Sequence, residues 1–302
     1  MTTLDQMVER VRSNLNQNTT NFPQVGTFKG WTLDGPDKVG VQLADIDVAD
    51  KLNHVLVELG HELVYVTSYD PTTGAATCPP WFRQRMGSPA NDTFPPDSMV
   101  TIDPRWTWWS VAQAVVAGIS ACSPDLFAVR TATLTTDVNV RRYLLPSDVE
   151  NILSLKVRLP GSEDRELPVK RYSLDTKAAD GNRYLHMAPV GMSGLPVYVT
   201  YRADPAPLSP SNPAGTWAST GLPETAEDIP VLWATATLLP AAEAARTQTA
   251  SIEQSDRARF IQTGSATSVA RVWMQQFQAR LAQERRALLD TFGARPHFEM
   301  NG

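Results

Sequence analysis

Residues 127–203 carry the pattern that most constrains the fold. Here the helical periodicity of the flanking sequence gives way to six short runs rich in Val, Leu, Tyr and Thr. Turn signals such as Pro-Gly and Asp-Gly separate the runs, which is typical of antiparallel strands joined by tight turns. The runs are FAVRTATLTTDVNV, RRYLLP, VENILSLKVRLP, ELPVKRYSL, RYLHMAP and LPVYVTYRA. Together they predict an antiparallel sandwich or barrel of about eighty residues.

Helical patterns precede this β segment. Thr3 and Gln6 form a capping box, and five apolar residues follow at one-face spacing: Leu4, Met7, Val8, Val11 and Leu15. A second helix is expected over residues 47–63, capped by Asp47, with the stripe Val48, Leu52, Val55, Leu56, Leu59 and Leu63. A third helix is expected from Asp103, with Pro104 in its first turn and Ser123-Pro124 as its stop.

Helical patterns return after the β segment. Asp228 can cap a helix with Pro230 in its first turn, and one face of that helix carries Val231, Thr235, Leu238, Leu239 and Ala242. The last helix is expected from about Ala266 to Phe292. Its buried stripe is predicted to be Val269, Trp273, Phe277, Leu281, Leu288 and Phe292, with Gln275, Gln278, Arg280 and Arg286 outside it.

Two long segments carry no helical pattern. Residues 17–40 are polar and rich in Gly and Asn, and residues 68–102 contain Pro71, Pro79, Pro80, Pro89, Pro95 and Pro96. Prolines at that density argue against a long helix or an interior strand. We expect both segments to be loops, and long loops are usually functional or bound to a partner.

The order of these segments predicts an α+β fold, in which an antiparallel β-sandwich or barrel domain is inserted into an α-helical bundle. The insertion lies between the third and fourth helices. The expected boundaries are 1–125 for the first part of the bundle, 126–210 for the inserted β domain and 211–302 for the second part. The last of these ends in a C-terminal tail, residues 293–302.

Composition and charge exclude several classes of function. The formal net charge is -5 and the pI is about 5.4, so no global basic surface drives tight nucleic-acid binding. The two cysteines, Cys78 and Cys122, allow no disulfide framework beyond one bond, and a reducing compartment is expected. We see neither a signal peptide nor a segment long enough to span a membrane, so no membrane contact is expected.

Sequence motifs for catalysis are missing as well. The chain has no Walker loop and no GxGxxG, and His54 and His61, seven residues apart, lack the HExxH spacing of zinc helices. They are expected to be surface residues of the second helix. GMSGL approaches the serine-hydrolase elbow, but Leu195 stands where the second glycine is needed, so a turn between strands is expected. The sequence therefore predicts no enzyme, no cofactor and no metal.

Three tryptophans, Trp106, Trp108 and Trp109, are concentrated in PRWTWWSV. Three interpretations stay open for them. They can belong to the core at the start of a helix, they can form a subunit or partner interface, or they can stack on bases or sugars. We carry them forward as candidate interface residues.

The end of the chain holds apolar residues that no expected element covers. Gly293 is a natural helix stop, and Pro296 prevents the helix from resuming. Phe298 and Met300 then place two large apolar side chains on a polar tail. We expect another protein to cover them.

Together these segments resemble the head-to-tail adaptor (connector) proteins of tailed bacteriophages, of the type with a β-domain inserted in the helical bundle. The resemblance spans most of the chain and departs from the simpler adaptors in the segments 17–40 and 68–102. It rests on the capped N-terminal helix and, in this order, on RRYLLPSDVENILSLKV, LPVYVTYRADPAPLS, DIPVLWATATLLPAAEAAR and VWMQQFQARLAQERRALL.

The resemblance implies a structural virion protein of the head-tail neck, assembled in the bacterial host cytoplasm and without catalysis. Such a protein forms a homo-oligomeric ring, usually a dodecamer, between the portal protein and a tail-side neck or stopper protein. Viral DNA passes through its channel without sequence-specific binding, which the acidic charge balance fits. The residues expected to dock on the portal are then Arg295, Pro296, His297, Phe298 and Met300, with Phe298 as the anchor.

Two other functions stay open at this point. A tail-side stopper or terminator ring protein is one, although such proteins are mostly β-structured and five helical segments argue against it. The other is a carbohydrate- or nucleic-acid-binding module that uses the β domain and the tryptophans.

Overall fold

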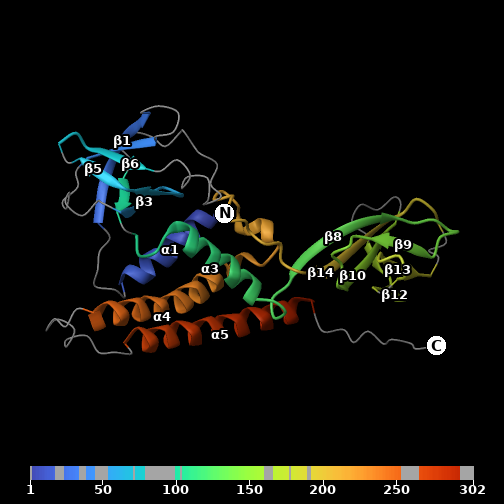
Figure 1. Cartoon of the computed structure of the whole chain (residues 1–302). Helices are drawn as coiled ribbons and strands as arrows, with labels where there is room; N and C mark the ends of the chain where they lie inside the picture. Colours follow the sequence, from blue (N-terminus) through green and yellow to red (C-terminus); the bar gives the residue numbers. More distant parts are fainter. Residues whose placement is uncertain are drawn as a thin grey trace.

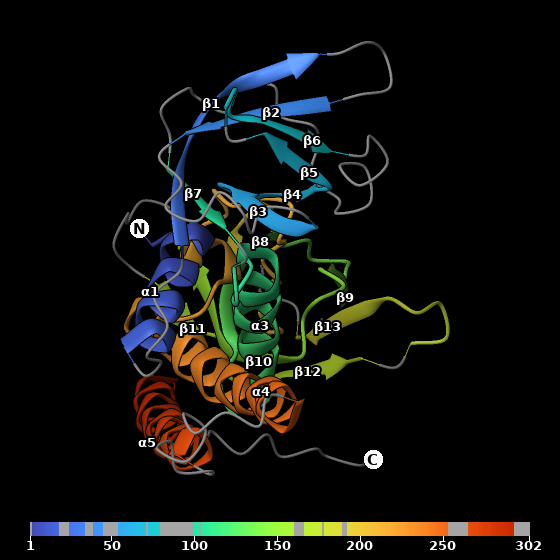
Figure 2. The ribbon, with the colours of Figure 1, turned by 60° about the vertical axis from the view of Figure 1, so that its left-hand side comes forward.

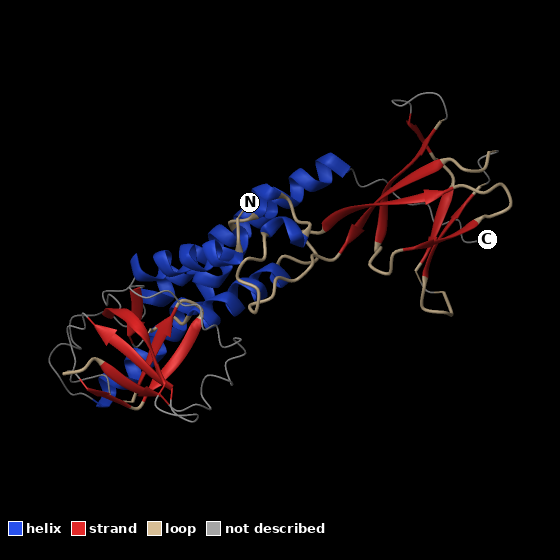
Figure 3. Ribbon diagram, turned by 90° about the horizontal axis from the view of Figure 1, so that it is seen from above, coloured by secondary structure: helices blue, strands red, loops and turns tan. Residues whose placement is uncertain are grey.

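Two β-structured units lie at opposite ends of a group of helices (Figure 1 and Figure 3). The computed structural model describes residues 2–17, 24–33, 39–44, 54–70, 72–78, 99–102, 104–159, 166–176, 178–188, 192–252 and 265–292. The expected α+β class is confirmed, since helices and several antiparallel sheets make up the described chain.

The helices α1 (Leu4–Gln17), α3 (Trp108–Ala121), α4 (Ile229–Ile252) and α5 (Ser265–Phe292) form the middle of the molecule. α4 packs against the other three, and α5 covers its side away from α1 and α3 (Figure 2). α3 and α4 approach closely at Gly118, where a Cβ would lie 3.0 Å from the Cα of Pro230. These helices and the short η2 (Trp217–Thr220) and η3 (Glu224–Ala226) enclose one apolar core, named here the helical core.

The predicted first helix is confirmed together with its capping box. The Thr3 backbone N–H donates to Gln6 Oε1 at 3.0 Å, and the Gln6 N–H donates back to Thr3 Oγ1 at 3.2 Å. The five residues of its apolar stripe are fully buried in the helical core: Leu4, Met7, Val8, Val11 and Leu15.

The predicted last helix is confirmed within one residue at its start. Phe277 and Leu288 of its stripe are buried, and the rest of the stripe is half-buried against the same core: Val269, Trp273, Leu281 and Phe292. Arg280 departs from the expectation, because it is half-buried and pairs with Asp228 at 2.8 Å and Glu284 at 3.2 Å.

The strands between α3 and α4 form two antiparallel sheets around a core of their own. Along β14, buried and half-buried residues alternate, as a strand with one face on a core requires. The strands are β8 (Ala128–Thr135), β9 (Arg142–Leu145), β10 (Asn151–Arg158), β11 (Glu166–Pro168), β12 (Tyr172–Asp175), β13 (Arg183–Met187) and β14 (Pro196–Ala203). Their order is β11-β10-β14-β8 in one sheet and β12-β13-β9 in the other. These described strands do not close into a barrel, so the sandwich alternative describes them better.

A seven-stranded sheet that the sequence did not predict covers the N-terminal side of the helices (Figure 2). Its order is β4-β3-β7-β1-β2-β6-β5. Its strands are β1 (Gln24–Leu33), β2 (Val39–Ala44), β3 (Val55–Leu59), β4 (Glu62–Val66), β5 (Ser68–Asp70), β6 (Ala75–Cys78) and β7 (Met99–Ile102). The expectation that residues 17–40 and 68–102 are loops was therefore wrong for five of these strands. β7 even pairs on both sides, whereas the six prolines of its segment all lie outside the described residues.

The helix predicted over residues 47–63 was also wrong. Its second half is the β3–β4 hairpin, in which Leu59 pairs with Glu62 across a two-residue turn of Gly60 and His61. Gly60 has φ 60°, which a tight hairpin turn favours. Because nearly every residue of VLVEL and LVYV is apolar or β-branched, the run satisfies a helical stripe and a strand alternation equally well. The proposed cap, Asp47, lies outside the described residues.

The third helix begins later than expected. Asp103 lies outside the described residues, and Pro104 precedes the helix rather than entering its first turn. Thr107 is the N-cap, because its Oγ1 accepts from the backbone N–H of Ser110 at 3.2 Å. The helix ends before Ser123-Pro124, as predicted.

Candidate functional site

The tryptophan cluster lies where α3 begins, at the junction of the seven-stranded sheet with the helices. Trp108 is only 2% exposed and belongs to the helical core. Its indole N–H donates to Asp5 Oδ1 at 2.9 Å, and its ring meets the His61 ring edge-on, with the centroids 4.5 Å apart. Trp108 therefore follows the core interpretation, and a ring so deeply buried offers no platform for a base or a sugar.

Trp106 and Trp109 are half-buried and pack against the same core. Arg12 donates to the Trp106 carbonyl at 2.9 Å, and the Arg105 guanidinium lies 5.8 Å from the centre of the Trp106 ring. These two rings keep some solvent-facing surface. The interface prediction therefore rests on Trp106 and Trp109, and it stays a prediction.

A buried carboxylate holds this junction together. Glu58 of β3 is 3% exposed, and it accepts hydrogen bonds from the Arg12 guanidinium of α1 and from the backbone N–H of Trp108 of α3. Burial raises the pKa of Glu58 above its ordinary value, and the Arg12 charge and the Trp108 N–H counteract part of that rise. One side chain thus joins the sheet to two helices. All its partners are protein groups, which marks a structural role.

The two histidines of this region do not share a helix face. His54 precedes β3 with φ 61°, and its Nδ1 lies 3.1 Å from the Tyr65 hydroxyl. His61 occupies the hairpin turn, with Nε2 2.9 Å from Asp5 Oδ1. Among the described residues, no group of three or more His, Cys, Asp or Glu side chains is arranged to hold a metal ion.

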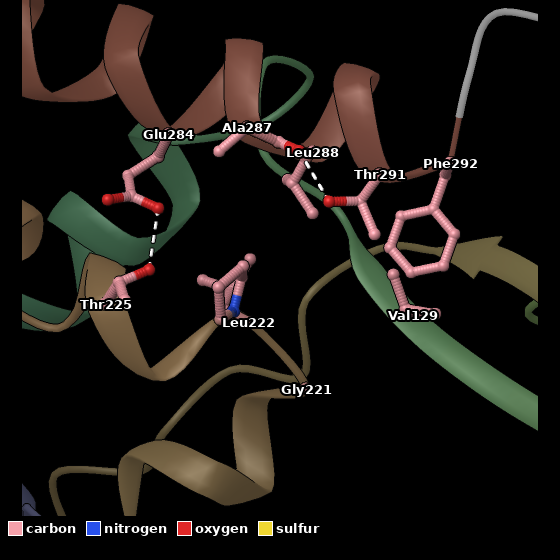
Figure 4. A pocket seen from close by; sticks show the side chains of 10 residues that line it. Val129, Gly221, Leu222, Thr225, Glu284, Ala287, Leu288, Thr291 and Phe292 are labelled. Carbon is pink, nitrogen blue, oxygen red and sulfur yellow. Dashed lines mark hydrogen bonds between the residues drawn. The ribbon is translucent and has the colours of Figure 1, made fainter.

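The end of α5 forms a second candidate site, since the C-terminal tail starts there. A pocket of about 360 Å³ lies between α5, the start of β8 and the segment that joins η2 to η3. The side chains of Val129, Leu222, Leu288 and Phe292 surround the same space (Figure 4). We name it the tail-base pocket.

The polar groups at the tail-base pocket are already paired with protein partners. Thr225 Oγ1 donates to Glu284 Oε2 at 2.7 Å, and Arg280 pairs with Oε1 of the same carboxylate at 3.2 Å. Thr291 Oγ1 donates to the Ala287 carbonyl at 2.8 Å. The surface that remains is apolar.

The five predicted docking residues of the tail, Arg295, Pro296, His297, Phe298 and Met300, lie outside the described residues. What the structure gives is their starting point. α5 ends at Phe292, directly before the predicted stop at Gly293.

A third feature, which sequence reasoning missed, lies at the end of the β8–β14 sheets away from the helices. Thr136 Oγ1 donates to the Met192 carbonyl at 2.9 Å, and the Val138 N–H donates to Ser193 Oγ at 3.0 Å. These bonds bring two loops together, and their apolar side chains stay exposed: Val138, Val140 and Met192. We name this surface the apolar tip. Valines alternating with polar residues in DVNV were the available signal.

Comparison with known proteins gives one match. Residues 82–296 match the family model described as SU10 adaptor protein. That range contains α3, all strands from β8 to β14, α4 and α5. No curated protein matches the sequence. None of the helices in the described ranges combines the length and apolar character that crossing a bilayer requires.

Proposed function

The chain belongs to the SU10 adaptor protein family, a family of bacteriophage structural proteins, and we propose that it is a head-to-tail adaptor. In this proposal the protein forms a homo-oligomeric ring, most simply a dodecamer, beneath the portal. The ring links the capsid to a tail-side neck or stopper protein, and viral DNA passes through its channel. It is part of the virion neck, it assembles in the host cytoplasm, and it has no catalytic activity and no cofactor.

The observation that carries the proposal is the extent of the family match. Residues 82–296 include three helices of the helical core and the β8–β14 sheets that lie between them in sequence. This arrangement supports the organisation that the sequence suggested, in which residues 126–210 are a β domain inserted into a bundle formed by 1–125 and 211–302.

The closed core of the subunit supports assembly through surfaces. Because α1, α3, α4 and α5 bury their apolar faces against one another, the subunit has no open apolar face that demands a neighbour to fold. Ring contacts then come from loops and polar faces, and a head-to-tail contact closes into a ring only when its rotation fits. Trp106, Trp109 and the apolar tip are the surfaces that we propose for subunit or partner contacts.

The charge of the chain supports a passive DNA channel. The net charge is -5, whereas a protein that grips DNA neutralises phosphates with an excess of Lys and Arg. A channel through which DNA slides should not hold its phosphates.

The tail supplies the docking element of the proposal. Ordering ten residues costs roughly 10–20 kcal/mol of backbone entropy, at about 1–2 kcal/mol each. Burying Phe298 and Met300 returns only about 1.5–3 kcal/mol per side chain. A single tail therefore binds the portal weakly, and a ring that presents many tails binds through effective concentration.

The test compares a chain that ends at Phe292 with a Phe298→Ala chain, with Glu299→Ala as the tail control. Portal-bearing capsids should retain the wild type and Glu299→Ala in a pull-down, and should lose the other two at unchanged circular dichroism. Electron micrographs of the retained complexes should show a ring below the portal. Normal retention of the truncated chain would remove the tail from the proposal, and retained protein without a ring would remove the adaptor role.

A further inference from the structure

We propose that the tail-base pocket is a binding site for the C-terminal tail of the same chain, and that Phe298 is the side chain that fills it. The pocket has a volume of about 360 Å³ and is lined chiefly by Val129, Leu222, Leu288 and Phe292. An aromatic ring is the side chain that gains most from filling an apolar space of this kind.

The chemistry of the pocket favours a side chain over a small polar ligand. Binding sites for small molecules add a few unpaired polar groups to an apolar lining, so that the ligand is oriented. Here the Thr225 hydroxyl and the Glu284 carboxylate satisfy each other, and Arg280 adds its charge to the same carboxylate. The remaining lining recognises shape and apolar surface alone.

The position of the pocket identifies the occupant. Phe292, the last residue of α5, lines the pocket, and ten residues follow it, from Gly293 to Gly302. Phe298 stands six positions after Phe292, a span of at most about 20 Å. The pocket follows α5 from Glu284 to Phe292, which is about 12 Å of helix. Phe298 is therefore long enough on its tether to turn back, and Gly293 permits the reversal because it adopts left-handed backbone conformations freely.

The same tether favours the chain's own tail over a neighbour's. A segment attached at the rim of its site is present at a high effective concentration, whereas a second copy must bring its tail by diffusion. One consequence rests on the proposed function: a Phe298 held in the tail-base pocket has to leave it before the tail docks on the portal.

The test places 4-fluorophenylalanine at position 298 of the full-length chain and records its ¹⁹F NMR resonance in the free protein. We expect this resonance to be displaced from that of a free peptide of residues 293–302. Ala287→Trp, which sets a large side chain on the lining of the pocket, should return the resonance to the free-peptide position. Ala282→Trp is the matched control, because Ala282 is exposed on the same helix and does not line the pocket, and it should leave the displacement intact.

Three results would overturn the inference. The first is a wild-type resonance that coincides with that of the free peptide. The second is a displacement that Ala287→Trp does not change. The third is a displacement that disappears on dilution, because it would mean that a second copy supplies the tail. No portal enters this experiment, so failure of the proposed function leaves its outcome readable.

Discussion

Glu58 of β3 accepts a hydrogen bond from the backbone N–H of Trp108, the first residue of α3. The two residues are 50 positions apart in the chain. The other oxygen of the same carboxylate accepts from the Arg12 guanidinium of α1. A single buried side chain thereby satisfies one backbone donor at a helix start and one charged side chain, and it fixes the sheet on the helices.

Replacing Glu58 by Ala should destabilise the protein by about 3 kcal/mol, because it leaves the Trp108 N–H and the Arg12 guanidinium without their acceptor. Glu58→Gln keeps a carbonyl oxygen at the site and should cost clearly less. Glu9→Ala is the control, since Glu9 is exposed and meets Arg12 only at 3.4 Å. Urea denaturation gives the three free energies of unfolding. Equal small losses for Glu58→Ala and Glu9→Ala would show that the junction does not depend on Glu58.

The pH dependence of Glu58→Gln should identify the buried carboxylate. Burial raises the pKa of Glu58 above 4.5, so the folded chain holds this proton more tightly than the unfolded chain. Between 4.5 and that raised pKa the folded state binds more protons, and the Glu58 contribution to the free energy of unfolding falls as pH rises. Glu58→Gln should therefore gain on the wild type from about pH 4.5 upward, in denaturation series at successive pH values.

Glu227→Gln should show the opposite trend. Hydrogen bonds from the Thr2 hydroxyl and the Arg10 guanidinium lower the pKa of Glu227 below 4.5. This carboxylate stabilises the fold above 4.5, and the contribution is lost as pH falls through the lowered pKa. The wild type should therefore gain on Glu227→Gln as pH rises. Parallel slopes for the two variants would contradict both assignments.

Phe277→Ala should destabilise the protein by about 3–5 kcal/mol, because Phe277 is buried in the middle of α5. Trp273→Ala, which the sequence alone would rank as highly, should cost less because the indole is only half-buried. Val272→Ala is the control on the same helix at 52% exposure, and it should stay within about 0.5 kcal/mol of wild type. Thermal melts rank the three, and a silent Phe277→Ala would mean that the buried face of α5 is wrong.

Gly221 and Gly181 form a matched pair for backbone strain. Both have positive φ, 77° and 74°, but a Cβ at Gly221 would lie 2.9 Å from the Ala128 Cβ, whereas nothing lies within 4 Å at Gly181. Gly181→Ala should lose about 1–2 kcal/mol from the left-handed conformation alone. Gly221→Ala should lose about 1–3 kcal/mol more, since the contact with β8 has to open. Equal losses in urea denaturation would show that the two segments separate freely at this point.

The isolated chain should be monomeric, because its helices already close the helical core. Native mass spectrometry of the purified protein at micromolar concentration measures this directly. A ring that persists without the portal, and whose subunits unfold when it is diluted apart, would contradict the expectation.

Sequence patterns predicted the parts of the fold whose information is local. The capping box of Thr3 and Gln6 and the stripe around Phe277 each lie within one helix, where a period of 3.6 residues identifies the buried face. Strands β8–β14 were predictable because turn residues separate them. The N-terminal sheet was not, because its order, β4-β3-β7-β1-β2-β6-β5, joins strands that are distant in the chain.

The candidate sites were less predictable for the same reason. No spacing rule relates Arg12, Glu58 and Trp108, which come from α1, β3 and α3 and meet only in the folded chain. The tail-base pocket likewise combines Val129, Leu222 and Leu288 from three separated segments. The sequence pointed to the tail through Phe298 and Met300, but it could not show what the tail starts beside.

The pairing of β8 with β14 has a mechanical consequence. The two strands pair over eight residues, from Ala128 opposite Ala203 at the helices to Thr135 opposite Pro196 near the apolar tip. The β8–β14 sheets are thus attached to the helices through a double ribbon whose hydrogen bonds lie across its length. A pull on the tip loads both chains side by side and peels neither from the other, so the unit behaves as a stiff lever, and a push on its far end is delivered to α3 and to the segment leading into α4.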